Sequence, residues 1–125
     1  IQDKIYFFGK SKNIYPIIKS MDIMVHPSRW EGFGIILVEA MLSKVPVIAS
    51  NRGGMPEVVE NKVTGFICPF GDVDSFVDSI LLLIKDKMLL NSFKNKGYMR
   101  AREKFNTEKM IVKYSKIYEN VNNQK

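Results

Sequence analysis

Three short apolar runs, each bounded by proline or glycine, place the strongest constraint on the fold. They cover residues 23–25, 45–49 and 66–68; Pro27 follows the first closely and Pro69 closes the last. Runs of this length are too short for helices, and their β-branched content favours buried strands. Segments with helical spacing separate them. Strands that alternate with helices predict an α/β fold: a Rossmann-like parallel sheet with flanking helices.

The segments around these strands complete the predicted organisation. We expect a further strand over residues 5–8, a short helix near 14–18, a helix over about 34–43 and one helical turn over 56–59. Asp72 or Asp74 should lie near the N-terminus of a helix whose apolar face comprises Val73, Phe76, Val77, Ile80, Leu81 and Ile84. Two more helices are expected over 88–104 and 107–121, giving a helical C-terminus. Thr107 should cap the last one, whose apolar stripe comprises Met110, Ile111, Tyr114, Ile117 and Tyr118.

Length bounds the chain to one domain of 125 residues, with an α/β part over about 1–71 and a helical part over about 72–121. No apolar stretch reaches the length of a membrane-spanning helix, and no signal peptide opens the sequence. We therefore expect a cytoplasmic location. Cys68 is the only cysteine, so an intrachain disulfide or a cysteine metal site is not expected.

The formal charge of +6 raises the question of an anionic partner. Lysine and arginine are spread along the chain and are densest over residues 94–104, where a solvated helix face is the simplest explanation. Attraction to anionic lipid headgroups on the cytoplasmic face of a membrane, or to phosphorylated substrates, is the alternative. Base-reading motifs are absent, so nucleic acid is not an expected partner.

The segment from Pro27 to Met41 (PSRWEGFGIILVEAM) is the most informative for function. A strand ends there, a glycine-bearing loop follows, and a helix begins; a helix start binds phosphate through its unpaired N–H groups. Gly32 and Gly34 allow a ligand to approach the backbone closely. Glu31 and Glu39 are suited to accepting hydrogen bonds from hydroxyls. The residues alone therefore indicate a ligand with a phosphate centre and hydroxyl-bearing ends.

Seven residues separate Glu31 from Glu39, and this spacing resembles the E-x7-E motif of retaining glycosyltransferase family 4 (group 1), which has the GT-B fold. The similarity includes the surrounding PSxxEGFG and EAM. It continues in the same order through residues 46–50, 53–59 and 64–66, so it covers most of the chain from residue 6 to about 74. A bare E-x7-E would be weak, whereas this ordered series is specific.

The resemblance implies a role for particular residues. Glu31 would be the catalytic-site residue that binds hydroxyls of the transferred sugar, and Glu39 would hold the ribose. Main-chain contacts to the sugar and diphosphate would come from Gly32, Phe33, Gly34 and Ile35, and contacts to the nucleobase from Gly9 and Lys10. The reaction would transfer a hexose from a UDP or GDP sugar with retention of configuration. No metal or other cofactor is implied, because protein cations and the helix dipole neutralise the diphosphate.

Two departures from the family pattern are visible. Lys44 stands where the family usually has the glycine that ends the helix, which predicts local strain or a different cap. The acceptor-binding N-terminal domain and the start of the nucleotide-binding domain are not in the sequence. We therefore expect a C-terminal donor-binding part that does not transfer sugar alone. Its strand over residues 23–25 would lack an inner neighbour, which favours self-association.

Several alternatives remain at this stage. The fold could serve a phosphorylase or a non-catalytic sugar-phosphate binder, or the chain could be a basic membrane-surface module. His26 could be a catalytic base or a structural residue, and the second is favoured because it closes an apolar strand. Trp30 could stack on a base or sugar, although packing within the loop is favoured. Glu57 could face the donor or simply start a helical turn.

Overall fold

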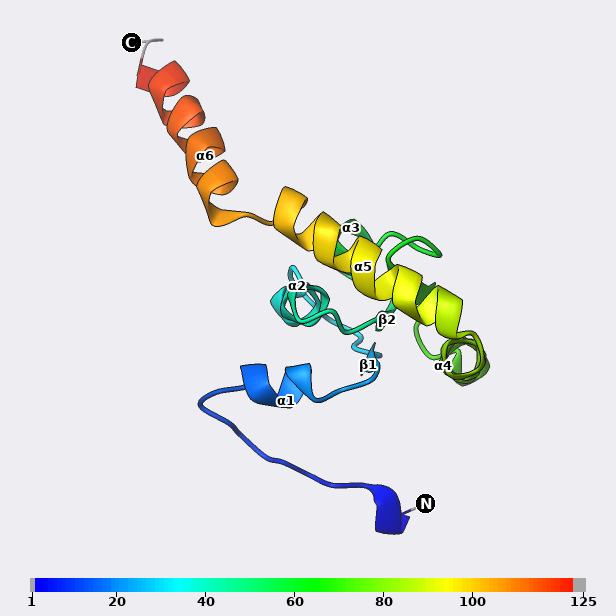
Figure 1. Cartoon of the computed structure of the whole chain (residues 1–125). Helices are drawn as coiled ribbons and strands as arrows, with labels where there is room; N and C mark the ends of the chain where they lie inside the picture. The colour runs from blue at the N-terminus through cyan, green and yellow to red at the C-terminus, as the bar shows by residue number, and fades with distance from the viewer. Residues whose placement is uncertain (1, 123–125) are drawn as a thin grey trace.

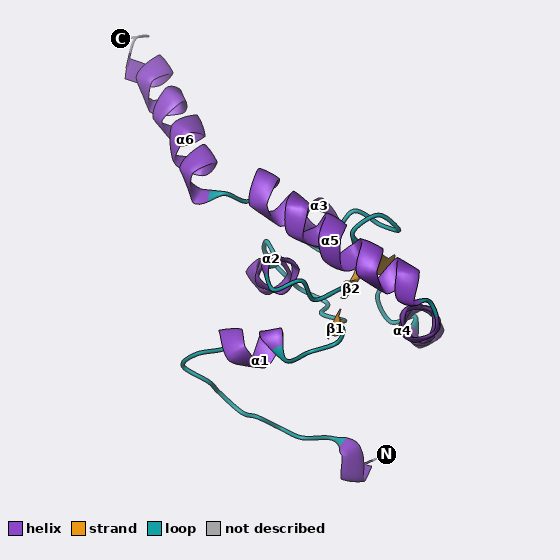
Figure 2. Ribbon diagram, viewed as in Figure 1, coloured by secondary structure: helices purple, strands orange, loops and turns teal. Residues whose placement is uncertain are grey.

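A computed structural model, which describes residues 2–122, contains a three-stranded parallel sheet in the order β1-β2-β3. Figure 1 labels β1 and β2 of this sheet. The strands are β1 (Met24–His26), β2 (Val47–Ser50) and β3 (Gly65–Cys68), drawn in orange in Figure 2. In the register Val25 lies opposite Ile48, and Ile48 opposite Phe66. The predicted α/β fold is confirmed, as are the three strands expected near these positions.

Helices connect and cover the strands. They are the 3-10 helix η1 (Gln2–Lys4), α1 (Tyr15–Lys19), α2 (Ile35–Leu42), α3 (Met55–Val58), α4 (Val73–Lys85), α5 (Lys87–Lys104) and α6 (Thr107–Asn122). In Figure 1 the N-terminal segment runs apart from the sheet, and α6 extends away from it at the other end of the molecule. The helical C-terminus is confirmed.

The core has two parts, one on each face of the sheet. On one face, Val47 and Ala49 belong to a cluster with residues of α1, α2 and α3; on the other, Ile48 packs with residues of α4 and α5. This alternation follows because successive side chains of a strand point to opposite faces. Helix α5 adds Ala101 to the first cluster and Phe93 to the second, so it joins the two.

The predicted strand over residues 5–8 is wrong. These residues form no regular structure, and their large side chains are exposed, with Phe7 95% exposed. A strand needs a neighbour to satisfy its backbone N–H and C=O groups, and no strand of residues 2–122 pairs with this segment. An apolar run alone does not reveal whether such a neighbour exists.

The N-termini of α4 and α6 confirm one expectation and correct another. Asp72 caps α4 by accepting hydrogen bonds from the hydroxyl and the amide of Ser75, which hold the pKa of its carboxyl below its usual value. Asn106, not Thr107, caps α6, because its Oδ1 accepts from the amides of Glu108 and Lys109 at 2.8 and 3.4 Å. A side chain one residue earlier can therefore take the capping role.

The apolar faces expected for these two helices are only partly buried. In α4 the buried residues are Phe76 and Leu83, with Ile80 packed against them, whereas Val73, Val77, Leu81 and Ile84 are exposed. The predicted stripe of α6 is exposed throughout: Met110, Ile111, Tyr114, Ile117 and Tyr118. The helical spacing was correct, but spacing does not identify which side of a helix meets a neighbour.

Lys44 adopts the left-handed conformation that the sequence suggested. Its φ is 57°, and the last turn of α2 closes through hydrogen bonds from the Lys44 amide to the Met41 carbonyl and from the Val45 amide to the Ala40 carbonyl, at 3.0 and 2.9 Å. This is the Schellman arrangement, with lysine at the position that glycine usually occupies. The Lys44 ammonium lies 5.2 Å from the ring centroid of Tyr98.

We predict that Lys44→Gly is more stable than Lys44→Ala by about 1 kcal/mol, because only glycine adopts this conformation without a steric penalty. Both variants lose the contact with Tyr98, so their difference isolates the backbone term. Urea denaturation of the two proteins measures it. Equal midpoints and slopes would show that Lys44 carries no backbone strain.

The outer edge of β1 is open. Within residues 2–122 it pairs only with β2, and Val25 is 40% exposed on the face where its neighbour Ile48 is buried. An unpaired strand edge exposes backbone donors and acceptors to another chain. Internal rearrangement, in which residues 5–8 would pair with β1, does not occur in this structure.

We therefore predict that the chain self-associates at micromolar concentration, with a mass above that of a monomer in light scattering. Val25→Lys places a charge on the open edge strand and should shift the population toward monomer, because such charges oppose edge pairing. Asp78→Asn, on exposed α4 surface, is the matched control. A monomer mass for the unmodified chain would contradict the prediction.

Candidate functional site

The loop between β1 and α2 contains the predicted site residues. Gly34, at φ 89°, turns the chain into the helix, and α2 begins at Ile35. The amides of Phe33, Ile35 and Ile36 donate to no group within residues 2–122. Three unpaired N–H groups thus lie at a helix N-terminus, which carries a partial positive charge. The N-terminus of α2 therefore favours the binding of an anion.

Glu31 is held at two points. Its Oε1 accepts a hydrogen bond from the amide of Gly34 at 3.2 Å, and its Oε2 lies 3.1 Å from Nε2 of His26. A carboxylate only accepts hydrogen bonds, so the imidazole donates through an Nε2–H tautomer. The side chains of Glu31 and His26 are 27% and 22% exposed, respectively. The glutamate is therefore fixed between the end of β1 and the start of α2 and still reaches solvent.

A second loop supports the first through close backbone contact. The amide of Gly54, after β2, donates to the carbonyl of Gly32 at 3.2 Å. A Cβ on Gly53 would lie 1.8 Å from the Glu31 carbonyl oxygen, and one on Gly54 would lie 2.7 Å from that of Gly32. Only glycine fits at these two positions. The sequence indicated a turn here, but not that the turn packs against the Glu31 loop.

The other predicted residues are placed as follows. Glu39 lies on the second turn of α2, half-buried, and makes no side-chain hydrogen bond or ion pair within residues 2–122. Phe33 and Ile35 are exposed, and Phe33 meets the ring of Phe105 edge-on at 5.5 Å. Trp30 is 82% exposed, so the expectation that it packs within the loop is wrong.

Gly9 and Lys10 lie on the exposed N-terminal segment. Gly9 has a left-handed φ of 65°, consistent with the turn expected there, and a Cβ added to it would meet nothing within 4 Å. In Figure 1 the N-terminal segment that precedes α1 runs apart from the sheet. Their contact with a nucleobase stays a prediction.

Two general features of the described residues bear on ligands and membranes. Over residues 2–122 no three histidine, cysteine, aspartate or glutamate side chains gather as a metal site would require. The helices in the same range include none with the length and apolar character to cross a bilayer.

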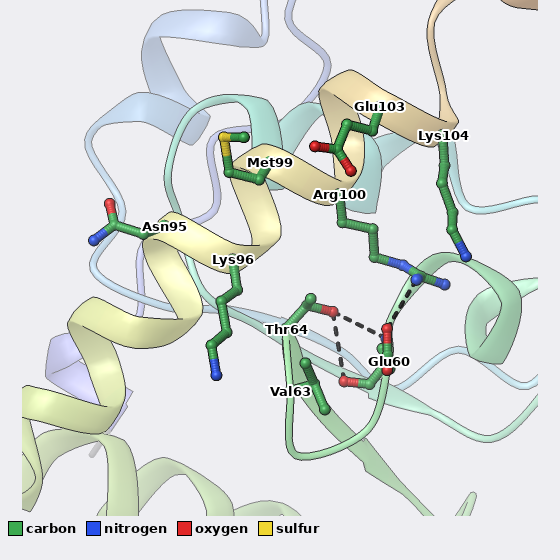
Figure 3. Close-up of a pocket in the computed structure, with 9 residues that line it drawn as sticks. All are labelled: Glu60, Val63, Thr64, Asn95, Lys96, Met99, Arg100, Glu103 and Lys104. Atoms are coloured by element: carbon green, nitrogen blue, oxygen red, sulfur yellow. Dashed lines mark hydrogen bonds and ion pairs between the residues drawn. The ribbon is translucent and has the colours of Figure 1, made fainter.

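Arg100, on the basic helix α5, was not among the predicted site residues. It donates to the carbonyls of Val58 and Glu57, both at 2.8 Å, and to the Glu60 carboxylate at 3.0 Å. Figure 3 shows the guanidinium directed at Glu60, on the wall of a recess of about 400 Å³ between α5 and residues 60–64. Arg100 thus ties α5 to the end of α3. The sequence carries no local signal of this role, because the partners of Arg100 lie 40 to 43 positions away.

A second recess, of about 740 Å³, lies between Phe33 and the α5–α6 junction, where Lys104, Lys109 and Lys113 contribute cations. Glu31 and Glu39 line neither recess. Phe33, another predicted site residue, does line the second recess. The candidate site lies where β1 ends and α2 begins, and ligands bind beyond the carboxyl ends of parallel strands.

Comparison with known proteins identifies the class. The family model for glycosyl transferases group 1 matches residues 1–100, and the chain belongs to this family. It is 35% identical over 121 residues to N-acetyl-alpha-D-glucosaminyl L-malate synthase of Bacillus anthracis, covering 97% of this chain and 32% of that protein. It is 32% identical over 123 residues to the lipopolysaccharide core biosynthesis mannosyltransferase LpsB of Rhizobium meliloti, covering 97% of this chain and 35% of the relative.

Solved structures agree with this assignment. HepE of Anabaena, in complex with UDP, superimposes with a TM-score of 0.91 at 26% identity, covering 95% of this chain and 33% of that one. The C-terminal domain of a glycosyl transferase group 1 family protein from Francisella tularensis gives 0.72 at 32% identity, covering 81% and 52%. The chain spans about one third of the length of the curated relatives it matches.

The Arg100 contacts generate a stability prediction. Arg100→Lys should destabilise the fold by about 1–3 kcal/mol, because one ammonium cannot replace a guanidinium that reaches two carbonyls and a carboxylate. Arg102→Lys is the matched control, since Arg102 is exposed on the same helix and its change should stay within about 0.5 kcal/mol. Urea denaturation compares them. Equal effects would mean that the Arg100 contacts do not stabilise α3.

Proposed function

We propose that this chain is the C-terminal, nucleotide-sugar-binding part of a retaining glycosyltransferase of family 4 that transfers a hexose. Three observations support the proposal: membership of the group 1 family, curated relatives named for transfer of mannose or galactose, and HepE structures with UDP and with UDP-glucose. Both UDP and GDP sugars are candidate donors. The rest of the enzyme would supply the acceptor domain.

The observation that carries the proposal is the N-terminus of α2 with its two glutamates. Unpaired amides of Phe33, Ile35 and Ile36 can bind a diphosphate. Glu31 has solvent-facing acceptor capacity for sugar hydroxyls beside them, and Glu39 follows on the same helix with a side chain that no other described group engages. Phosphate and hydroxyl groups in one ligand are what a nucleotide sugar presents.

In the proposed complex each residue has one task. Glu31 binds and orients the transferred sugar, and Glu39 accepts hydrogen bonds from the ribose hydroxyls. Gly32 admits the ligand to the backbone, and the amides of Phe33 and Ile35 meet the diphosphate. Because the Gly34 amide already donates to Glu31, it contributes to the site by holding that carboxylate. Gly9 and Lys10 would reach the nucleobase if the N-terminal segment folds over the start of α2.

The chemistry expected of this part is stabilisation of the leaving diphosphate. Negative charge that develops there is favoured by fixed N–H dipoles at the start of α2, which need no reorganisation during the reaction. The proposal includes no metal or organic cofactor. Transfer also requires the acceptor to be held against the donor, so we propose that this chain does not catalyse transfer by itself.

We predict that Glu39→Ala weakens nucleotide binding by about 1.5–3 kcal/mol, the value of hydrogen bonds to a charged acceptor. Titration of UDP and GDP into the isotopically labelled chain, followed by amide NMR, measures the affinity. The unmodified chain should bind one of them with a dissociation constant of roughly 1 mM, about −4 kcal/mol.

Asp78→Asn removes a carboxylate from an exposed position on α4 and serves as the control that should bind like the unmodified chain. Unchanged affinity in Glu39→Ala would exclude Glu39 from the ribose site. If neither nucleotide binds, the proposed function itself is wrong.

A further inference from the structure

We propose that His26 is a positioning residue that sets the Glu31 carboxylate for recognition of the donor's sugar. The inference rests on the proposed function, since it assumes that Glu31 binds sugar hydroxyls. It goes beyond that function because it assigns a specificity role to a residue outside the E-x7-E motif. His26 would act through Glu31 and would not touch the ligand.

The strand geometry places His26 beneath the loop. His26 is the last residue of β1 and, two positions after Met24, its side chain points to the same face of the sheet. On that face Met24 belongs to the cluster that contains Leu37 and Val38 of α2. The imidazole therefore emerges at the edge of the first core cluster, where the chain turns back over it at Glu31.

The imidazole supplies one of two anchors for Glu31. A carboxylate has about four lone-pair directions, and here one is used by the Gly34 amide and one by His26 Nε2. These bonds involve different oxygens, so together they fix the plane of the group as well as its position. The remaining directions are available on the 27% of the side chain that is exposed. With the Gly34 contact alone, the carboxylate could rotate away from the orientation that meets a sugar.

A purely structural histidine and a positioning histidine make different predictions. A structural role would weaken all ligand binding together with stability. A positioning role affects only the sugar contribution. We define the sugar contribution as the dissociation constant of the free nucleotide divided by that of the nucleotide sugar. Binding of the nucleotide alone depends on Glu39 and the amides of α2, which His26 does not contact in the structure.

The experiment uses the full chain of 125 residues, followed by amide NMR. UDP and GDP are compared with UDP-glucose, UDP-galactose, UDP-N-acetylglucosamine and GDP-mannose. The nucleotide sugar that binds most tightly, together with its free nucleotide, is then used to test the variants. His26→Phe keeps a planar ring without a hydrogen bond, while His26→Gln restores an N–H donor at a similar reach. We expect His26→Phe to lower the sugar contribution about 3- to 10-fold, with nucleotide binding unchanged, and His26→Gln to recover most of it.

The Gly34 amide provides a readout that needs no ligand. Because it donates to Glu31, its resonance should shift in His26→Phe and stay near its original position in His26→Gln. A double-mutant cycle then tests the route of action: in a Glu31→Gln background, His26→Phe should have no further effect on the sugar contribution. Dispersion of the amide spectra checks that each variant is folded.

The outcomes separate this inference from the proposed function. Loss of the sugar contribution in Glu31→Gln, with none in His26→Phe, would overturn the role of His26 and leave the proposed function intact. An equal loss of nucleotide and nucleotide-sugar binding in His26→Phe would also overturn it, in favour of a structural role. Binding of no nucleotide by the unmodified chain would overturn both.

Discussion

Burial of β2 on both faces is the constraint on which the rest of the structure depends. All four of its residues are buried, so one face needs α1, α2 and α3 and the other needs α4 and α5. Its neighbours β1 and β3 run parallel to it, and the chain therefore returns through a helix between strands. The loops that follow β1 and β2 consequently emerge at the same edge of the sheet. Residues of both loops can therefore contribute to one site.

Backbone contacts then convert this edge into a defined surface. Arg100 fixes the end of α3 from outside, and the Gly53-Gly54 turn at the start of α3 lies against the carbonyls of Glu31 and Gly32. The Glu31 loop thus packs against the start of α3, and the end of α3 is held by Arg100 of the long helix α5. No side chain fits at Gly53 or Gly54, so this support depends on close approach of the two backbones more than on apolar packing. A loop that presents ligand-binding groups gains rigidity from it.

The sequence was sufficient where the signal was local and insufficient where a partner decided the outcome. Short apolar runs located β1, β2 and β3, and helical spacing located α1 to α6. Lysine at position 44, where the family usually has glycine, indicated a strained helix end. Residues 5–8 have an equally strand-like composition, yet they stay exposed because strand formation depends on a neighbour. The site residues came from a motif, whereas the pairing of His26 with Glu31 and the reach of Arg100 to Val58, 42 positions away, required three-dimensional contacts.

The start of α2 has to accommodate two anions in the proposed complex, and the structure suggests how. Glu31 already occupies one amide of the helix N-terminus, and a diphosphate nearby would repel it. The two anions do not compete for the same donor, since the carboxylate takes the Gly34 amide and leaves those of Phe33, Ile35 and Ile36. A formal charge of +6 favours the approach of an anionic ligand from solution. A carboxylate and a phosphate can therefore share one helix end, because each takes its own amide donors.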